Sequence, residues 1–381
     1  MTRGAEGGTR RPAANVKRLI LAGGGHSHIE VLRRFANAPP VATELILVTP
    51  SPLLLYTGMW PGWIGGIYAT EECTIDSERL ALRAGAAFVP ASVIGIDPAT
   101  STVQLDDGTQ LEYDCLSLDV GATPPIHHVA GATEHAIPVK PIKAFGDWWI
   151  SLLRDRARPI RLGIVGGGVG GIEVAMAMHH RLAAGDESYG TVFVVTGSSD
   201  ILPHQNARAR RWISETLAES GIEVHTNSVV EAVEARSLRL VSGGKLEFDH
   251  LVLATGVAPP TWLKHSGLAL DERGFIVVNS SLQSVSHANV FAAGDVASMQ
   301  SHRLPKAGVY AVRQGPVLAE NLRRALAGEP LRTYRPQRSA LALIGTGERS
   351  AVAARGAFAL KGNCVWRWKE LIDRRFVARY R

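Results

Sequence analysis

Three glycines near the middle of the chain, Gly166, Gly168 and Gly171, have the residue type and the spacing that hold a diphosphate group. Gly166 allows a tight turn, Gly168 lets a diphosphate approach the backbone, and Gly171 lets a helix pack closely on a strand. Apolar residues precede the turn, and apolar residues at helical period follow it. The segment 161–179 therefore predicts a strand, a turn and a helix whose N-terminal N–H groups bind phosphate.

The same pattern occurs earlier, in the segment 16–35. Gly23 and Gly25 take the first two glycine places, and His28 stands in the third. Two such turns, each opening a strand–helix unit, predict two bound nucleotides. His26 and His28 lie two residues apart, which does not place them on one helix face, so we expect no metal site there.

A threonine ends the strand that follows each turn, Thr49 in the segment 44–49 and Thr196 in the segment 192–196. An acidic residue usually binds the nucleotide ribose at this place. A hydroxyl binds ribose more weakly than a carboxylate does, and no arginine directly follows Thr196 to bind a 2′-phosphate. The choice between the two nicotinamide dinucleotides therefore stays open.

Two similar segments, DCLSLDVG at 114–121 and DHLVLATG at 249–256, each run from an apolar strand into glycine. Their likeness predicts a second nucleotide domain inserted into a first domain that resumes afterwards. We expect an α/β protein with two Rossmann-like domains and a C-terminal α+β segment. The expected boundaries are a disordered tail (1–15), a discontinuous first domain (16–124 and 259–332), an inserted domain (125–258) and a C-terminal segment (333–381).

The motif NVFAAGDV at 289–296 delivers Gly294 and Asp295 to the carboxyl end of a strand. Ligands of α/β sheets bind at that end, so the Asp295 carboxylate is predicted to bond the ribityl hydroxyls of a flavin; a solvated turn aspartate is the alternative. A helix predicted over 306–326 faces the pyrimidine edge of the flavin with its N-terminus.

Two aromatic segments each allow two interpretations. The segment 52–67 is rich in Gly, Pro and aromatic residues, which excludes a regular helix; it is either a loop against a flat ring or an irregular surface loop. The segment 364–381 mixes aromatic residues with Arg and Lys in a predicted helix. This helix either lies on an anionic bilayer or packs its aromatic side chains on the core.

Composition excludes several classes of function. The 381 residues are 46% hydrophobic and 20% charged, with a formal net charge of +6, and carry no nucleic-acid-binding motif. Three cysteines lie far apart, without a metal-binding or redox pair, which favours a reducing compartment. No signal peptide and no apolar run long enough to span a membrane is found. We expect a cytoplasmic enzyme.

These motifs together resemble the two-dinucleotide flavoproteins of the pyridine nucleotide-disulfide oxidoreductase superfamily, in a layout similar to type II NADH dehydrogenases and sulfide:quinone oxidoreductases. The segments LAGGGHSHIEVLRRF, YTGMWPG, LPKAGVYAVRQGP and WRWKELIDRRF more closely resemble the flavoprotein module found fused to selenide, water dikinase, also called selenophosphate synthase. The kinase half is absent from this sequence. A separate selenophosphate synthase is thus an implied partner.

The resemblance implies FAD and NAD(P)H as cofactors, with Glu173 near the nicotinamide as the candidate catalytic residue. The implied FAD-binding residues are Gly23, Gly24, Gly25, His28, Thr49, Val93, Gly121, Ala122, Gly294, Asp295 and Lys306. The implied NAD(P)H-binding residues are Gly166, Gly168, Gly171, Thr196 and Gly256.

The implied activity is hydride transfer from NAD(P)H to FAD, followed by electron transfer to a quinone-like, sulfur or selenium acceptor. Val309 and Arg313 replace the glutamines of the quinone-facing helix, and only Gln314 is kept. The paired cysteines of sulfide oxidoreductases have no counterpart. Two alternatives therefore stay open: a flavoprotein reduced by a small sulfur or selenium donor, and a flavin-bearing interaction module.

Overall fold

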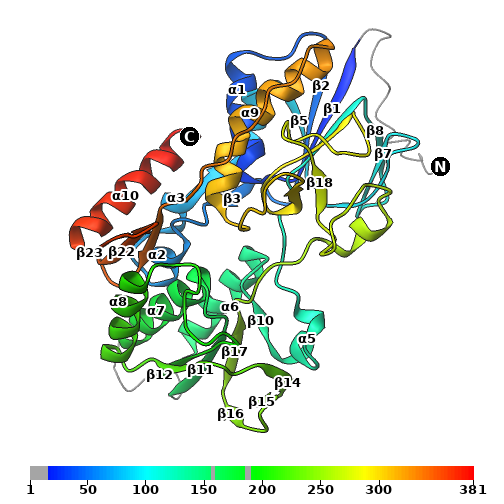
Figure 1. Ribbon diagram of the computed structural model, residues 1–381. Coiled ribbons are helices and arrows are strands. Elements are labelled where there is room, and N and C mark those ends of the chain that lie inside the picture. Colours follow the sequence, from blue (N-terminus) through cyan, green and yellow to red (C-terminus); the bar gives the residue numbers. More distant parts are fainter. Residues whose placement is uncertain (1–15, 156–158, 185–189) are drawn as a thin grey trace, which may run out of the picture.

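The structure is a computed structural model that describes residues 16–155, 159–184 and 190–381. The tail predicted for residues 1–15 lies outside this part of the chain. The described chain contains two parallel sheets, drawn one above the other in Figure 1, and a C-terminal unit beside them. The predicted α/β class with two Rossmann-like sheets is confirmed.

The first parallel sheet has the strand order β19-β9-β1-β2-β5. Its strands are apolar along most of their length because both faces of a parallel sheet are covered. Ala22 at the end of β1 lies opposite Val48 on one side and Leu118 on the other, so three strands end at one edge. The bounds are β1 (Lys17–Ala22), β2 (Thr43–Val48), β5 (Ala86–Val89), β9 (Cys115–Leu118) and β19 (Val290–Ala292).

The second parallel sheet repeats this arrangement in the order β10-β17-β11-β12-β13. Val165 at the end of β11 lies opposite Val195 and Leu253, as Ala22 does in the first sheet. The strand β19 of the first sheet follows this whole sheet in the sequence. The bounds are β10 (Ile137–Pro138), β11 (Ile160–Val165), β12 (Gly190–Val195), β13 (Glu223–His225) and β17 (His250–Leu253).

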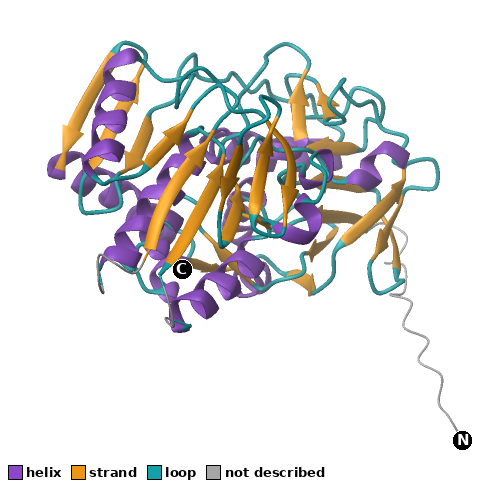
Figure 2. Ribbon diagram, turned by 90° about the horizontal axis from the view of Figure 1, so that it is seen from below, coloured by secondary structure: helices purple, strands orange, loops and turns teal. Residues whose placement is uncertain are grey.

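Helices cover both parallel sheets, and Figure 2 shows the strands from below with helices beside them. In the first turn unit, α1 buries Ile29, Leu32 and Phe35 at helical spacing; in the second, α7 buries Ile172, Ala175 and Met176. The bounds are α1 (His26–Asn37), α3 (Thr70–Cys73), α4 (Ser77–Arg83), α5 (Ala132–His135), α6 (Ile142–Arg154), α7 (Val169–Ala183) and α8 (Ala207–Glu219).

Small antiparallel sheets decorate the two units. They are β6 (Val93–Asp97), β7 (Thr102–Leu105) and β8 (Gln110–Glu112); β14 (Val230–Glu234), β15 (Ser237–Leu240) and β16 (Lys245–Glu247); and the pair β3 (Leu53–Leu55) with β4 (Thr74–Asp76). A parallel pair joins β18 (Ile276–Val278) to β20 (Ala297–Met299).

The segment 52–67 contains a short helix, α2 (Trp60–Ile64), so the prediction that it holds no helix was wrong there. Pro61 stands in the first turn of α2, where its missing N–H has no intrahelical partner to lose.

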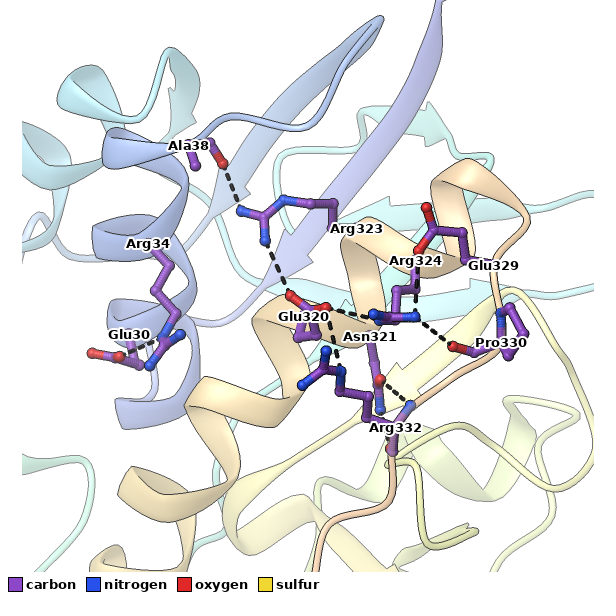
Figure 3. Close-up of polar contacts among 10 residues, drawn as sticks. All are labelled: Glu30, Arg34, Ala38, Glu320, Asn321, Arg323, Arg324, Glu329, Pro330 and Arg332. Atoms are coloured by element: carbon purple, nitrogen blue, oxygen red, sulfur yellow. Dashed lines mark hydrogen bonds and ion pairs between the residues drawn. The ribbon is translucent and has the colours of Figure 1, made fainter.

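The helix α9 (Gly308–Ala327) packs along α1 and is fixed by polar contacts at its C-terminal half. Glu320 forms ion pairs with Arg323, Arg324 and Arg332 (Figure 3). Arg323 also donates a hydrogen bond to the carbonyl of Ala38, which follows α1. Towards its other end, α9 contacts β9 and, through Gln314, the turn that follows β19. Lys306 precedes this helix, which begins two residues later than predicted.

The C-terminal unit consists of β21 (Ala342–Gly345), β22 (Ala351–Arg355), β23 (Phe358–Gly362) and α10 (Asn363–Ala378). Trp366 and Phe376 of α10 are buried, and the hydroxyl of the buried Tyr380 donates to Glu30 on α1 over 3.0 Å. These aromatic side chains pack on the core, as one of the two interpretations predicted. Trp368, Leu371 and Ile372 on the same helix stay exposed.

Among the described residues, no helix combines the length and the apolar character needed to cross a bilayer.

Candidate active site

The first turn is built around Gly23, which follows β1 in the left-handed region with φ of 96°. Its N–H donates to the carbonyl of Val48 over 2.8 Å. A Cβ at Gly23 would overlap the backbone of Asp119, which follows the neighbouring strand β9. Both the backbone conformation and the close approach therefore require glycine at this place.

The second turn repeats this geometry with Gly166, whose N–H donates to Val195 over 2.9 Å and whose φ is 138°. A Cβ at Gly171 would overlap the carbonyl oxygen of Gly166, so the third glycine brings α7 close to the strand. A Cβ at Gly168 would meet no protein atom within 4 Å. Gly168 therefore presents open backbone at the start of α7, where a diphosphate can approach.

His28 takes the third glycine's place in the first turn, and its side chain is fully buried. Its Nδ1 lies 2.6 Å from the carbonyl oxygen of Gly23, and its Nε2 lies 2.8 Å from the hydroxyl oxygen of Ser117. The imidazole thus joins α1 to the first turn and to β9. In the second turn, Gly171 instead lets α7 contact the turn directly. The structure places His28 behind the turn, with both ring nitrogens bonded within the protein.

Thr49 and Thr196 also occupy matching places, and each is nearly buried. A Cβ at Gly24 would lie 3.1 Å from the Thr49 hydroxyl, and one at Gly167 would lie 2.9 Å from the Thr196 hydroxyl. Each threonine therefore packs beneath the second residue of its turn, at the edge where a ribose is expected.

The two crossover segments lie side by side. The N–H of Thr123 donates to Ala258 over 3.0 Å, and the N–H of Ala258 donates back over 2.8 Å. Gly121 has a φ of 73°. A Cβ added at Gly121 or at Gly256 would meet no protein atom within 4 Å. Of the other sequence-predicted residues, Ala122 is buried directly after Gly121, and Val93 is buried at the start of β6.

A cavity of about 460 Å³ opens beside Gly294 and Asp295, and Lys306 and Gln314 also line it. The Asp295 carboxylate lies 3.2 Å from Lys140, which follows the second-sheet strand β10. Gln314 on α9 accepts a hydrogen bond from the N–H of Gly294 over 2.7 Å. The kept glutamine therefore holds the turn that carries Asp295.

Lys306 lines the same cavity, with its ammonium 3.8 Å from the centre of the Phe275 ring and bonded to the carbonyl of Ala297. Burial lowers the pKa of Lys306 to about 8. The cavity therefore contains a carboxylate and a cation that is readily deprotonated.

Glu173 lies on α7 and faces the C-terminal unit. Its Oε1 accepts a hydrogen bond from the N–H of Gly345 over 2.8 Å, and burial raises the pKa of Glu173 to about 7. Lys369 of α10 acts against that rise, and Lys369 itself pairs with Asp373 at 2.7 Å with both side chains buried. Glu173 can hold or release a proton at neutral pH.

Two site residues were missed from the sequence. Asp119 is buried and accepts hydrogen bonds from the N–H groups of Ser27 (2.8 Å) and His28 (3.3 Å); burial raises its pKa to about 7. Lys140 was missed because its partner Asp295 is far away in the sequence. The signal for Asp119 was present, because LSLDVG carries an aspartate where LVLATG carries Ala254.

His26 begins α1 and lies in an aromatic cluster, with ring centroids 5.6 Å from Tyr56 and 5.9 Å from Phe376. Within the described part of the chain its Nε2 has no hydrogen-bond partner, and burial lowers the pKa of His26 to about 4. Tyr56 stacks on Phe376 at 4.3 Å. The C-terminal helix therefore meets the first turn through aromatic rings.

The His, Cys, Asp and Glu side chains are the possible metal ligands, and three of them are cysteines. No cluster of three or more His, Cys, Asp or Glu side chains there is arranged to hold a metal ion. Cys73 and Cys115 are buried, and burial raises the pKa of each thiol to about 12, which keeps both protonated; Cys364 is exposed and free.

Comparison with known proteins gives a family match and several similar proteins. The family model for pyridine nucleotide-disulphide oxidoreductases matches residues 17–315. Demethylphylloquinone reductase NdbB of Synechocystis sp. is 25% identical, and the match covers 96% of this chain and 92% of that protein.

Two solved structures share the fold. One is the sulfide:quinone oxidoreductase of Aquifex aeolicus, with a TM-score of 0.80 and 19% identity over 96% of this chain and 92% of that one. The other is NDH2 of Plasmodium falciparum in complex with NADH, with a TM-score of 0.77 and 15% identity over 96% of this chain and 97% of that one.

Proposed function

Because the chain belongs to the pyridine nucleotide-disulphide oxidoreductase family, it is a flavin- and nicotinamide-dependent oxidoreductase, and we propose that it passes a hydride from NAD(P)H to FAD and then electrons to a quinone-like, sulfur or selenium compound. The observation that carries the proposal is the repeated turn. Gly23 and Gly166 follow the central strands of two sheets with the same hydrogen bonds, and the crossovers between them are paired. Such a chain holds two dinucleotides on one framework.

The residues at the first turn fit a flavin dinucleotide. Gly121 leaves open space beside the turn, and the cavity at Asp295 offers a carboxylate to ribityl hydroxyls. When bound, FAD and the nicotinamide supply the hydride chemistry. The FAD-binding residues in this proposal are Gly23, Gly24, Gly25, Thr49, Val93, Gly121, Ala122, Gly294, Asp295 and Lys306, with His28 acting behind the turn.

The residues at the second turn fit a nicotinamide dinucleotide. Gly168 offers open backbone at the N-terminus of α7, and Gly256 faces open space at the crossover. Gly166, Gly171 and Thr196 shape the turn beneath them. Glu173, one turn into α7, holds a proton near neutral pH and is the proposed catalytic residue.

The proposal is tested by turnover with a panel of acceptors. The purified protein is given NADH or NADPH together with a short-chain quinone, a polysulfide or selenite, and nucleotide oxidation is followed. Gly168→Asp adds a carboxylate to open space at the diphosphate position, so it should leave folding intact and abolish turnover. Equal turnover by wild type and Gly168→Asp would contradict the proposed nucleotide site.

A second candidate is a flavoprotein reduced directly by a small sulfur or selenium donor. Thr196 favours it, because this residue offers the nicotinamide ribose only a hydroxyl that is nearly buried. Under this alternative, sulfide or selenide bleaches the bound flavin and NADH and NADPH do not.

The outward face of α10 supports a further part of the proposal, peripheral contact with an anionic membrane. Trp368, Leu371 and Ile372 are 40%, 47% and 39% exposed, and the same helix carries Arg367, Arg374 and Arg375. Leu371→Ser should reduce flotation with vesicles of phosphatidylglycerol and phosphatidylcholine, whereas Val41→Ser, at an equally apolar exposed position outside α10, should not. Flotation unchanged by Leu371→Ser would contradict membrane contact, and capture of a separate selenophosphate synthase would assign this face to a protein partner.

A further inference from the structure

Besides the exchange of His28 for Gly171, the two dinucleotide turns differ in the residue that follows the adjacent strand. In the first turn this residue is Asp119, whose N–H donates to Ala22 over 2.9 Å. In the second it is Ala254, whose N–H donates to Val165 over the same distance. The backbone hydrogen bonds match at this residue, and the side chains differ.

The Asp119 carboxylate lies at the N-terminus of α1. The N-cap residue is Gly25, which has no side chain to accept the free N–H groups of the first turn. Asp119 takes this role from another strand and accepts from Ser27 and His28 through one oxygen. A Cβ at Gly25 or at Gly294 would overlap the carboxylate, so these two glycines make room for it.

At the corresponding end of α7, Ala254 stands in the place of Asp119, and no carboxylate of the described residues caps the helix there. Its N-cap residue is Gly168, and an added Cβ there meets no atom within 4 Å. A diphosphate at the second turn therefore finds the positive helix end free. A diphosphate at the first turn must share that end with a buried carboxyl group, and two anions at one desolvated place repel strongly.

We infer that Asp119 takes up a proton when the diphosphate of a flavin dinucleotide binds to the first turn, so that this site, unlike the second, weakens as pH rises. The inference rests on the proposed function, because it assumes that the first turn binds the flavin. The neutral carboxyl group keeps its acceptor oxygen for Ser27 and His28 and removes the repulsion.

The groups around Asp119 leave it as the group that titrates near neutrality. Burial raises the pKa of Asp119 to about 7, and Asp295 acts in the same direction. His26 and His28 on α1 have a pKa lowered to about 4 by burial and stay neutral above that range. Asp295 pairs with Lys140, and α9 contributes the uncharged Gln314.

Lys306 is the other group that titrates in this range, because burial lowers its pKa to about 8. Loss of its charge also weakens anion binding at high pH. The test therefore has to separate Asp119 from Lys306.

The test is FAD binding to flavin-free protein by calorimetry in two buffers of different ionisation enthalpy. Asp119 should account for an uptake of about half a proton per FAD at pH 7 and about nine tenths at pH 8, to which Lys306 adds up to about a tenth and about half, respectively. The dissociation constant, followed by flavin fluorescence, should be nearly constant below pH 6 and should rise towards about tenfold per pH unit above pH 7.

Asp119→Asn keeps an acceptor oxygen but cannot ionise. This variant should bind FAD with an affinity that changes little between pH 6 and 7, and its proton uptake at pH 7 should fall to about a tenth or less, the part that belongs to Lys306. Asp119→Ala, which copies Ala254, should behave likewise. NADH binding to the same proteins is the internal control: it reports that each variant is folded, and any proton exchange there belongs to Glu173 and should be the same in wild type and both variants.

Absence of proton uptake in wild type, or the same uptake in Asp119→Asn, would overturn the inference and assign any proton to Lys306. A chain that binds no FAD at any pH would instead contradict the proposed function. The two failures are therefore distinguishable.

Discussion

Replacing Lys369 by alanine is expected to lower the free energy of unfolding by about 3–5 kcal/mol. The Lys369 ammonium lies 2.7 Å from the Asp373 carboxylate, each side chain is only 6% exposed, and the ammonium also donates to the carbonyl of Gly58. Without Lys369, Asp373 is buried with no cation, and Glu173 loses the charge that favours its ionised form. An unpaired buried charge costs far more than an unpaired surface charge.

The chain supplies a matched control in the pair Lys143 and Asp147 of α6. This pair has the same i,i+4 spacing and the same 2.7 Å distance, but its side chains are 81% and 65% exposed. Lys143→Ala should therefore cost less than about 0.5 kcal/mol. The double variant Lys369→Met with Asp373→Leu should recover most of the lost stability, because it removes both charges and keeps the volume.

Urea denaturation at pH 7, followed by tryptophan fluorescence and extrapolated to zero denaturant, measures these differences. Equal costs for Lys369→Ala and Lys143→Ala would refute the argument that burial sets the strength of the pair. A double variant no more stable than Lys369→Ala would refute the argument that the unpaired charge is the source of the loss.

The remaining predictions concern α7. Burial raises the folded-state pKa of Glu173 to about 7, above its unfolded value, so this group destabilises the fold as pH rises from about 4.5 to about 7. Glu173→Gln should therefore stabilise the protein by about 3 kcal/mol at pH 8 and change little at pH 4, and an equal effect at both pH values would contradict the assignment. Gly171→Ala should cost about 1–3 kcal/mol because its Cβ overlaps the Gly166 carbonyl oxygen. Gly168→Ala should change the free energy of unfolding by less than about 0.5 kcal/mol and should weaken NADH binding about tenfold. Thermal unfolding and a binding titration check these values. A larger loss of stability in Gly168→Ala than in Gly171→Ala would show that the roles of the two glycines are misassigned.

Local patterns predicted the turns and the parallel strands. Gly23 and Gly166 are required by backbone conformation, which depends on the residue itself and its nearest neighbours, and the apolar runs beside them reflect burial on both sheet faces. Gln314 was recognised as the kept glutamine, but its hydrogen bond to Gly294 depends on how α9 meets the sheet. The spacing of residues along the sequence does not show how a helix packs against a sheet, so it could not predict this hydrogen bond.

Long-range pairings account for what was missed. Asp119 caps a helix that begins far from it in the sequence, and Lys140 reaches Asp295 from the second sheet. The strand β23 and the buried pair of α10 depend on packing of the C-terminal unit against α3, α7 and α8, so composition alone left two interpretations of that helix. The helix α2 was missed because proline is typical of a helix breaker, although Pro61 stands in the first turn, where its missing N–H has no intrahelical partner to lose.

The proposed function requires that two dinucleotide sites on one chain exchange a hydride. An anaerobic titration of the purified protein with NADH, and separately with NADPH, measures this most directly through the visible flavin band. We predict one tightly bound flavin per chain and its full bleaching by about one equivalent of the preferred nucleotide. A bound flavin that neither nucleotide reduces would contradict hydride transfer between the two sites.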